Sequence, residues 1–336
     1  MNYKRIFQIV LFFLSINLFA LSNQEITPEN RLIGLRKYME ASSNVEQRKA
    51  ILQQIGQTGT FLAMIYAGEF LDDEVLRQTA ANAVVNIALG HKDFTGTNVR
   101  ELLKKAYIVL DKSDEVNQRK SISKHLEEMP DEEGFVAIFN GKDLTGWKGL
   151  VGNPITRAKM SPDELAAAQV KADEQVRKDW TVENGLLIFD GTGYDNLCTT
   201  KQYGDIEMYI DWLLDPDTKD ADGGVYLRGT PQVQIWDIFR VGVGAEVGSG
   251  GLYNNRTHPS IPLKVADNAT GEWNTFFIRM VGEHVTVYLN GTLVTDNVIL
   301  ENFWDRTKPV VSIEQIELQA HASKIYYRNI FVRELK

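Results

Sequence analysis

The chain has 336 residues, which is enough for two domains with sizeable hydrophobic cores. It is 43% hydrophobic and 24% charged with only 9 Pro, which excludes long disordered or collagen-like tracts. The net charge of −9 disfavours a nucleic-acid partner or an anionic membrane surface, because both require a cationic face. Cys198 is the single cysteine, which excludes an intramolecular disulfide and a thiolate-rich zinc site; we interpret it as a small buried hydrophobic residue.

The first 22 residues have the features of a signal peptide. The cations Lys4 and Arg5 precede an apolar run, and the small residues Ala20 and Ser22 follow it at the spacing that signal peptidase requires. The apolar run is shorter than the about 20 residues that a membrane-spanning helix needs. We therefore expect an exported protein, periplasmic or secreted, without a membrane span.

Residues 23–130 carry apolar residues at helical period, which predicts a small all-α domain. Short helices separated by glycine-containing turns resemble HEAT-like repeats, and residues 74–90 match best. Such a domain could be a docking surface for a partner or, as we favour, a helical cap on the second domain. The helix stop at Pro130, within an acidic cluster, predicts the domain boundary.

Residues 131–336 contain many short strand patterns separated by Gly, Asn and Asp turns, which predicts a mainly β domain with a jelly-roll sandwich. The exception is a helical insertion near 161–178, whose start at Ser161 and Glu164 has the pattern of a capping box. We expect this helix to lie across a rim of the sandwich or to fill a gap beside a cleft. Residues 284–291 predict a hairpin in the sheet opposite the site.

Alternation in four predicted strands separates core-facing from outward-facing side chains. The predicted core residues are Met208, Ile210, Trp212, Val225, Leu227, Val233, Ile235, Ile316 and Leu318. The outward-facing residues are Glu207, Tyr209, Asp211, Tyr226, Arg228, Gln232, Gln234, Trp236, Glu317, Gln319 and His321. Amides, an arginine, aromatic rings and a histidine are typical of a sugar-binding surface.

Three of these residues are the first candidates for chemistry. His321 shares a face with Glu317, so we expect it to contact substrate or transfer protons, although a polar residue in a loop is the alternative. Arg228 ends a strand, where it could bind a ligand or form a structural ion pair. We predict no cofactor and no metal site: Glu317 and His321 could ligate a divalent cation, but two ligands without a third make a weak signal.

Residues 134–147, GFVAIFNGKDLTGW, closely resemble the opening strand of the 3-keto-disaccharide hydrolase domain family. The resemblance continues in order through 180–185 (WTVENG), 224–229 (GVYLRG), 233–237 (VQIWD), 250–253 (GGLY), 271–274 (GEWN), 289–291 (LNG) and 318–330 (LQAHASKIYYRNI). It covers residues 134–336 and implies a concanavalin-like sandwich with a concave face. It also implies action on glycosides whose 3-hydroxyl a separate oxidoreductase has converted to a ketone. Many family members have Glu where Gln232 stands, a departure that removes one cleft carboxylate.

A ketone at C3 acidifies the hydrogen on C2, so a base can start β-elimination of the aglycone from C1, and water then adds to the enone. We hypothesise that His321, with Glu317 or Asp211, transfers protons and that Arg228 stabilises the enolate oxygen. The expected substrate-binding residues are Gln234, Gln319, Tyr226, Trp236, Tyr253 and Asn254. The alternatives are a noncatalytic lectin-like module, an envelope scaffold that docks the oxidoreductase, and a conventional glycosidase acting on the unoxidised glycoside.

Overall fold

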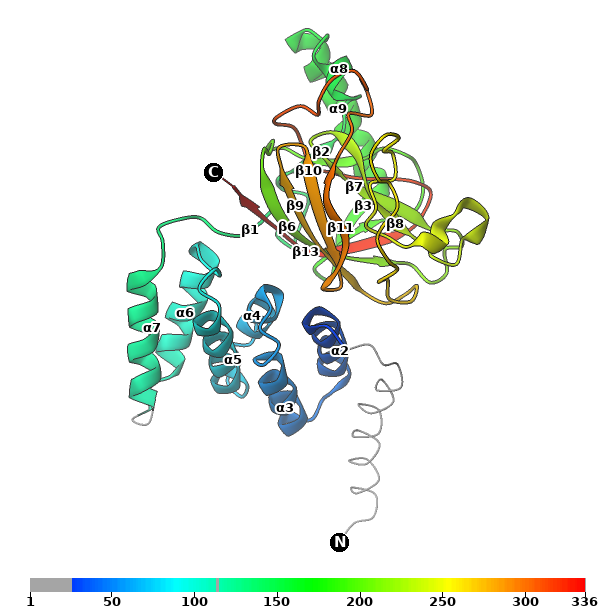
Figure 1. Ribbon diagram of the computed structural model, residues 1–336. Coiled ribbons are helices and arrows are strands. Elements are labelled where there is room, and N and C mark those ends of the chain that lie inside the picture. The colour runs from blue at the N-terminus through cyan, green and yellow to red at the C-terminus, as the bar shows by residue number, and fades with distance from the viewer. Residues whose placement is uncertain (1–25, 113–114, 336) are drawn as a thin grey trace.

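The computed structural model describes residues 26–112 and 115–335, so the signal peptide predicted at 1–22 lies outside the described residues. Two layers of different architecture follow each other along the chain, first helices and then a β-sandwich (Figure 1). No helix within the described ranges is long and apolar enough to cross a membrane.

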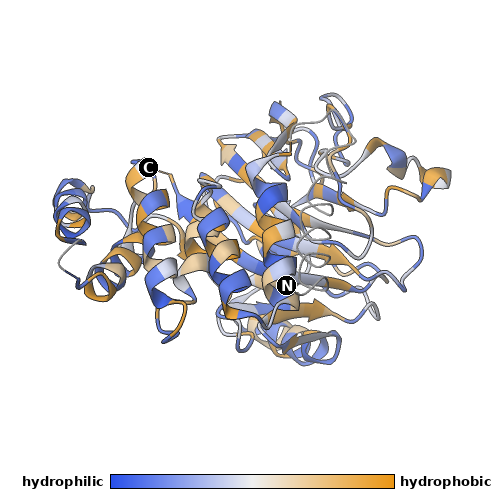
Figure 2. Cartoon of the chain, turned by 90° about the horizontal axis from the view of Figure 1, so that it is seen from below, coloured by the Kyte–Doolittle hydropathy of each residue, from blue (hydrophilic) through white to orange (hydrophobic). Residues whose placement is uncertain are grey.

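The first layer consists of short helices that run back and forth (Figure 1). They are α2 (Pro28–Ala41), α3 (Val45–Ile55), α4 (Phe61–Gly68), α5 (Arg77–Gly90), α6 (Thr97–Val109) and α7 (Val116–Glu128). The side chains of Thr27, Asn44 and Thr60 cap the first three by accepting a backbone N–H of the first turn. Figure 2 shows hydrophobic and hydrophilic residues interspersed along these helices, as expected for helices with one buried face.

The second layer is a sandwich of two antiparallel sheets, which confirms the predicted mainly β fold. The eight-stranded sheet has the order β11 (Thr292–Ile299), β10 (His284–Leu289), β9 (Asn274–Val281), β6 (Ile206–Leu214), β13 (Ile325–Glu334), β4 (Leu186–Phe189) and β3 (Trp180–Glu183), with β1 (Val136–Ala137) on β13. The five-stranded sheet has the order β2 (Trp147–Gly149), β5 (Leu197–Thr199), β12 (Glu317–Leu318), β7 (Asp222–Leu227) and β8 (Thr230–Trp236). The hairpin predicted near 284–291 is β10–β11, in the sheet opposite β7, β8 and β12.

The core between the sheets is the one that strand alternation predicted. Every residue predicted to face the core on β6, β7, β8 and β12, including the segment directly before β12, is buried in one continuous hydrophobic cluster. Trp212 and Tyr327 are among the largest fully buried side chains. The core-facing positions that strand alternation predicted are therefore confirmed.

The helical insertion predicted near 161–178 is present as α9 (Pro162–Asp179), which begins with the expected capping box between Ser161 and Glu164, and a short helix that was not predicted, α8 (Pro154–Arg157), precedes it. Helix α9 lies across the edge strand β2. The backbone N–H of Gly149 donates to Asp173 Oδ1 at 2.9 Å, and a Cβ at Gly149 would meet the backbone of Ala172 at 2.3 Å. Glycine is therefore required for this close approach.

The helical layer covers the outer face of the eight-stranded sheet (Figure 1). Phe61 of α4 stands at the centre of an aromatic cluster, with ring centroids 5.6 Å from Tyr209 on β6, 5.5 Å from Phe331 on β13 and 4.9 Å from Phe135. Of the two arrangements expected for the helices, the structure has the one in which they cap the sandwich. The helices pack on residues of β6, β9 and β13, which belong to the eight-stranded sheet, and not on the five-stranded sheet.

Candidate functional site

The outer face of the five-stranded sheet gathers most of the predicted site residues. Strand pairing sets Glu317 beside Tyr226 on β7, and places Asp222 of β7 beside Trp236 and Gly224 beside Gln234 on β8. These side chains come from three different strands and point to the same side, away from the helical layer. The structure therefore brings together Tyr226, Gln234, Trp236 and Glu317.

His321 lies just beyond β12 in a cluster of charged groups. Its imidazole Nδ1 is 2.6 Å from Asp222 Oδ1, and Arg240 Nη1 donates to Asp222 Oδ2 at 2.7 Å. Burial raises the pKa of Asp222, and the neighbouring charges of His321 and Arg240 oppose that effect. The contact of Nδ1 with the carboxylate leaves Nε2 as the ring nitrogen without a partner in this pair, and the side chain is 45% exposed. The arrangement suits a general base.

One aromatic ring contacts this histidine, and a second aromatic pair lies on β8 and the segment after it. Tyr194 meets His321 edge to face, with centroids 5.7 Å apart, and Tyr253 stands perpendicular to Trp236 at 5.3 Å. Tyr194 and Tyr253 are largely exposed, so their rings are available for stacking on the C–H face of a sugar. Asn254 is half-buried, and its carbonyl accepts a hydrogen bond from Arg306 at 2.8 Å.

The amides on this face differ in how far their hydrogen bonds are satisfied. Gln232 donates to Gln234 Oε1, and Gln234 Nε2 donates to the carbonyl of Ile235 at 3.0 Å, so Gln234 is engaged within the sheet. Gln319 Oε1 is buried and accepts no hydrogen bond from the described residues. An unpartnered buried acceptor two residues from His321 is suited to a substrate hydroxyl.

Glu317 occupies the interior of the same face. It is 1% exposed, and burial raises the pKa of its carboxyl to about 7 although Arg157 opposes the shift. Asn196 Nδ2 lies 3.5 Å from its Oε2. Glu317 is paired with Tyr226, whereas His321 contacts Asp222, which lies four residues or about 13 Å away along strand β7, so the two groups do not form a pair at one reacting bond.

The expected ligand role of Arg228 does not agree with the structure. The side chain forms an ion pair with Asp205, and its Nε donates to the carbonyl of Gly204 at 3.1 Å. The pairing of β7 with β8 shifts register between Val225 and Leu227, and Arg228 has a positive φ of 48°. Because the regular alternation ends at this irregularity, Arg228 binds the turn before β6 instead of joining Tyr226 and Glu317 on the outer face of the sheet.

The expectation that Asp211 is a cleft carboxylate is also wrong. It lies on the outer face of the eight-stranded sheet under α2, where it is 2% exposed. Arg36 and Arg328 approach its Oδ2 at 3.6 and 3.2 Å, and Thr275 donates to Oδ1 at 2.6 Å. Alternation identified Asp211 correctly as outward-facing, but the face in question is the one that the helices cover.

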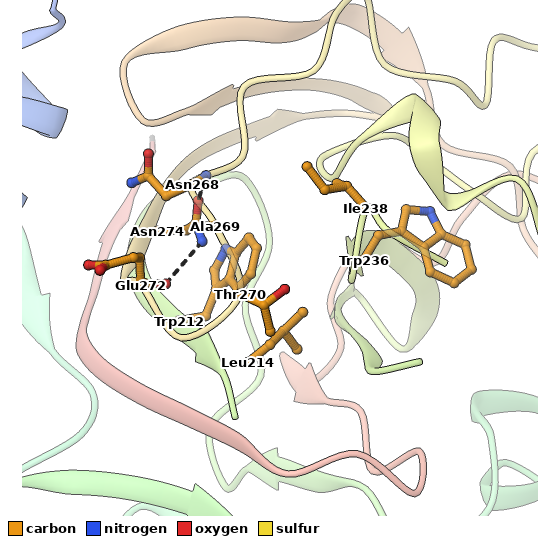
Figure 3. Close-up of a pocket in the computed structure, with 9 residues that line it drawn as sticks. All are labelled: Trp212, Leu214, Trp236, Ile238, Asn268, Ala269, Thr270, Glu272 and Asn274. Carbon is orange, nitrogen blue, oxygen red and sulfur yellow. Dashed lines mark hydrogen bonds between the residues drawn. The ribbon is translucent and has the colours of Figure 1, made fainter. Parts of the chain in front are cut away.

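A small cavity lies between Trp212, Trp236 and the loop that carries Asn268 and Thr270 (Figure 3). Its volume of about 10 Å³ is comparable to the space that one water needs. The buried Nε1 of Trp212 has no partner among the described residues, but the space is too small for a sugar. Across the described ranges, no group of three or more His, Cys, Asp and Glu side chains could hold a metal ion.

Comparison with known proteins gives the following findings. A family model described as "3-keto-alpha-glucoside-1,2-lyase-like domain" matches residues 134–333. A 3-keto-disaccharide hydrolase of Bacteroides thetaiotaomicron is 20% identical over 256 residues, covering 61% of this chain and 80% of that protein. A Parabacteroides distasonis protein, provisionally named a glycosyl hydrolase, is 21% identical with a TM-score of 0.44, covering 60% of this chain and 94% of that one. The carbohydrate-binding module CBM66 of Bacillus subtilis is 12% identical with a TM-score of 0.34, covering 56% and 96%.

Proposed function

This chain belongs to the 3-keto-alpha-glucoside-1,2-lyase-like domain family, whose model spans more than half of it, and we propose that it cleaves 3-keto-glycosides. The family and the Bacteroides relative support a carbohydrate-active, glycoside-cleaving enzyme. The observation that carries the proposal is the contact between His321, whose side chain is partly exposed, and the buried Asp222 at the end of the polar face. It supplies an oriented base where an elimination mechanism needs one.

In the proposed reaction, His321 Nε2 removes the proton from C2, and the C–H electrons form the enolate of the C3 ketone. The enolate then expels the aglycone oxygen from C1, which leaves a C1–C2 double bond conjugated with the ketone. The imidazolium returns its proton to the departing oxygen. Water next adds its hydroxyl to C1 and a proton to C2, so the net reaction is hydrolysis.

The neighbouring residues would orient the sugar. Asp222 holds the imidazole in one tautomer and stabilises the imidazolium, in the manner of the carboxylate of a catalytic triad. Gln319 would bind a hydroxyl through its unpartnered Oε1, and Tyr194 and Tyr253 would stack on the ring. Glycoside or oligosaccharide is therefore the proposed substrate, with the ketone formed by a separate oxidoreductase. No cofactor of this chain takes part in the proposed steps.

The test uses an aryl 3-keto-glucoside, as both anomers, and the matching unoxidised glucoside. We expect aryl release from the keto compound only, and a product formed in deuterated water that carries deuterium at C2, with the product alone incubated as the exchange control. His321→Gln should lower the rate by about 10²–10⁴-fold with little change in stability. His284→Gln, which alters an exposed histidine on β10, is the matched control.

Other results would contradict the proposal in different ways. Cleavage of the unoxidised glucoside would indicate a conventional glycosidase. Binding of both compounds with no turnover would indicate a lectin-like module. A parental rate for His321→Gln would place the base elsewhere.

We also propose that the protein is exported, since residues 1–22 have the pattern of a signal peptide. Mass analysis of the protein made in its natural host should show a chain that starts at Asn23. A chain that retains Met1 in the cytoplasm would overturn this proposal.

A further inference from the structure

A cleft of about 570 Å³ lies between the helical insertion and the edge of the five-stranded sheet, lined by residues of α8, α9, β2 and β5. Figure 1 shows where these elements lie. The volume of the cleft is typical of sites that hold small organic ligands. Gln315, which lines it, accepts a hydrogen bond from the backbone of Gly229 just after the end of β7, whereas His321 contacts Asp222 at the start of that strand. The cleft is therefore separate from the end of the face where His321 lies.

The polar wall of the cleft is fixed by a network around Glu314. Arg157 Nη2 lies 3.0 Å from Glu314 Oε2, and Gln202 Nε2 donates to Oε1 at 2.6 Å. Arg157 Nη1 also donates to the carbonyls of Val151 and Gly152, both at 2.9 Å. These contacts hold α8 against the sheet, so the wall is already ordered without a ligand.

One polar group in this wall has no partner. Gln315 is 5% exposed, and its Oε1 accepts no hydrogen bond from the described residues. A buried amide oxygen in this state has an acceptor position free for a donor from a bound molecule or a water. The apolar side chains of Pro154 and Leu165, which also line the cleft, supply a surface for C–H groups.

The charged groups of the wall are mostly paired within the protein. Lys148, Arg157 and Glu314 line the cleft, and Arg157 Nη2 neutralises Glu314 at 3.0 Å, which leaves one lysine as the further charge of the lining. A fixed amide acceptor, an internally paired wall and an apolar surface together match a neutral polyhydroxylated ring.

We propose that this cleft is a second carbohydrate site, which binds an unoxidised glycosyl unit of a longer glycan. The proposal rests on the proposed function only in its choice of ligand class, because binding here requires neither His321 nor a ketone. It predicts that the protein binds oligosaccharides that it does not cleave.

The test is calorimetry of the full chain with maltotetraose and cellotetraose as probes. We expect at least one to bind, and we expect Ala158→Trp, which fills the cleft from the exposed end of α8, to weaken binding at least tenfold. Val170→Trp adds the same ring to an exposed position of α9 outside the cleft and should bind normally. Gln315→Leu should also weaken binding without loss of thermal stability, because it removes an acceptor that has no partner in the protein.

The failure of this proposal is distinguishable from that of the proposed function. If neither tetrasaccharide binds while the keto-glucoside is turned over, the second site is refuted and the enzyme stands. If His321→Gln abolishes tetrasaccharide binding while Ala158→Trp retains it, the ligand sits on the catalytic face and the proposal is wrong. If both tetrasaccharides bind and no keto-glucoside is cleaved, only the enzymatic function fails.

Discussion

Replacing Glu317 with Gln should stabilise the protein at alkaline pH. Burial raises the pKa of this carboxyl from 4.5 to about 7, so the folded state favours the protonated form. Its contribution to stability is present below about pH 4.5 and is lost as the pH rises to about 7. At about 1.4 kcal/mol per pKa unit, the loss amounts to about 3 kcal/mol. A glutamine at this position avoids that loss at every pH, because it resembles the protonated carboxyl in shape and charge.

The assay is unfolding in urea, followed by circular dichroism, at pH 4.5 and pH 8.5. Glu317→Gln and the parent should agree within about 0.5 kcal/mol at pH 4.5, and the variant should be about 3 kcal/mol more stable at pH 8.5. Glu183→Gln removes the same charge from an exposed site on β3 and should show no such divergence. Equal stabilities of Glu317→Gln and the parent at pH 8.5 would show that this carboxyl is not desolvated, and the reasoning from burial would fail.

Three further substitutions test how the rest of the structure is held. Asp211→Asn removes the countercharge of the buried Arg36 and Arg328 and should cost about 3–5 kcal/mol in urea unfolding, with kcat unchanged at a temperature where the variant is folded. A fall in kcat of the folded variant would return Asp211 to the catalytic candidates. Arg228→Met removes the ion pair between a buried guanidinium and the partly exposed Asp205 and should lower the thermal midpoint while retaining kcat. A folded but inactive variant would show that Arg228 takes part in the reaction. Phe61→Ala should lower the free energy of unfolding by about 3–5 kcal/mol, because it leaves a cavity in the aromatic cluster between the layers. An unchanged free energy of unfolding would show that this interface does not contribute to stability.

The sequence predicted those features that depend on local periodicity. The core positions of β6 and β8 follow from alternation, and the start of α9 follows from the capping box at Ser161 and Glu164. Both patterns act over a few residues, so no tertiary information is needed. The same alternation could not distinguish the two sheets. Asp211 and Gln234 are both outward-facing, yet they lie on opposite sides of the molecule because β6 and β8 belong to different sheets.

Other features depend on irregular segments and distant contacts. Arg228 follows a register shift that ends the alternation, and no local pattern in the sequence indicates where such a shift occurs. Sequence reasoning missed Tyr194 and Arg157 because a loop and the insertion bring them to the sheet. The start of α8 at Asn153 and Pro154, a cap followed by proline, was the one local signal that could have directed attention to Arg157.

The outer faces of the two sheets differ in chemistry. One is apolar and covered by helices, and the other is polar and is the face on which we propose that a ligand binds. Tyr209, Phe277 and Phe331 project from the eight-stranded sheet and would form an exposed apolar patch without the helices. Covering these rings with the helices buries hydrophobic area, which stabilises the interface. Asp211 is also paired with Arg36 of α2 across the same interface. The five-stranded sheet instead carries amides and carboxyls, whose burial is favourable only when each group finds a partner. Gln319 and Gln315 lack one within the described structure, and the hydroxyl-rich ligand that we propose would supply it.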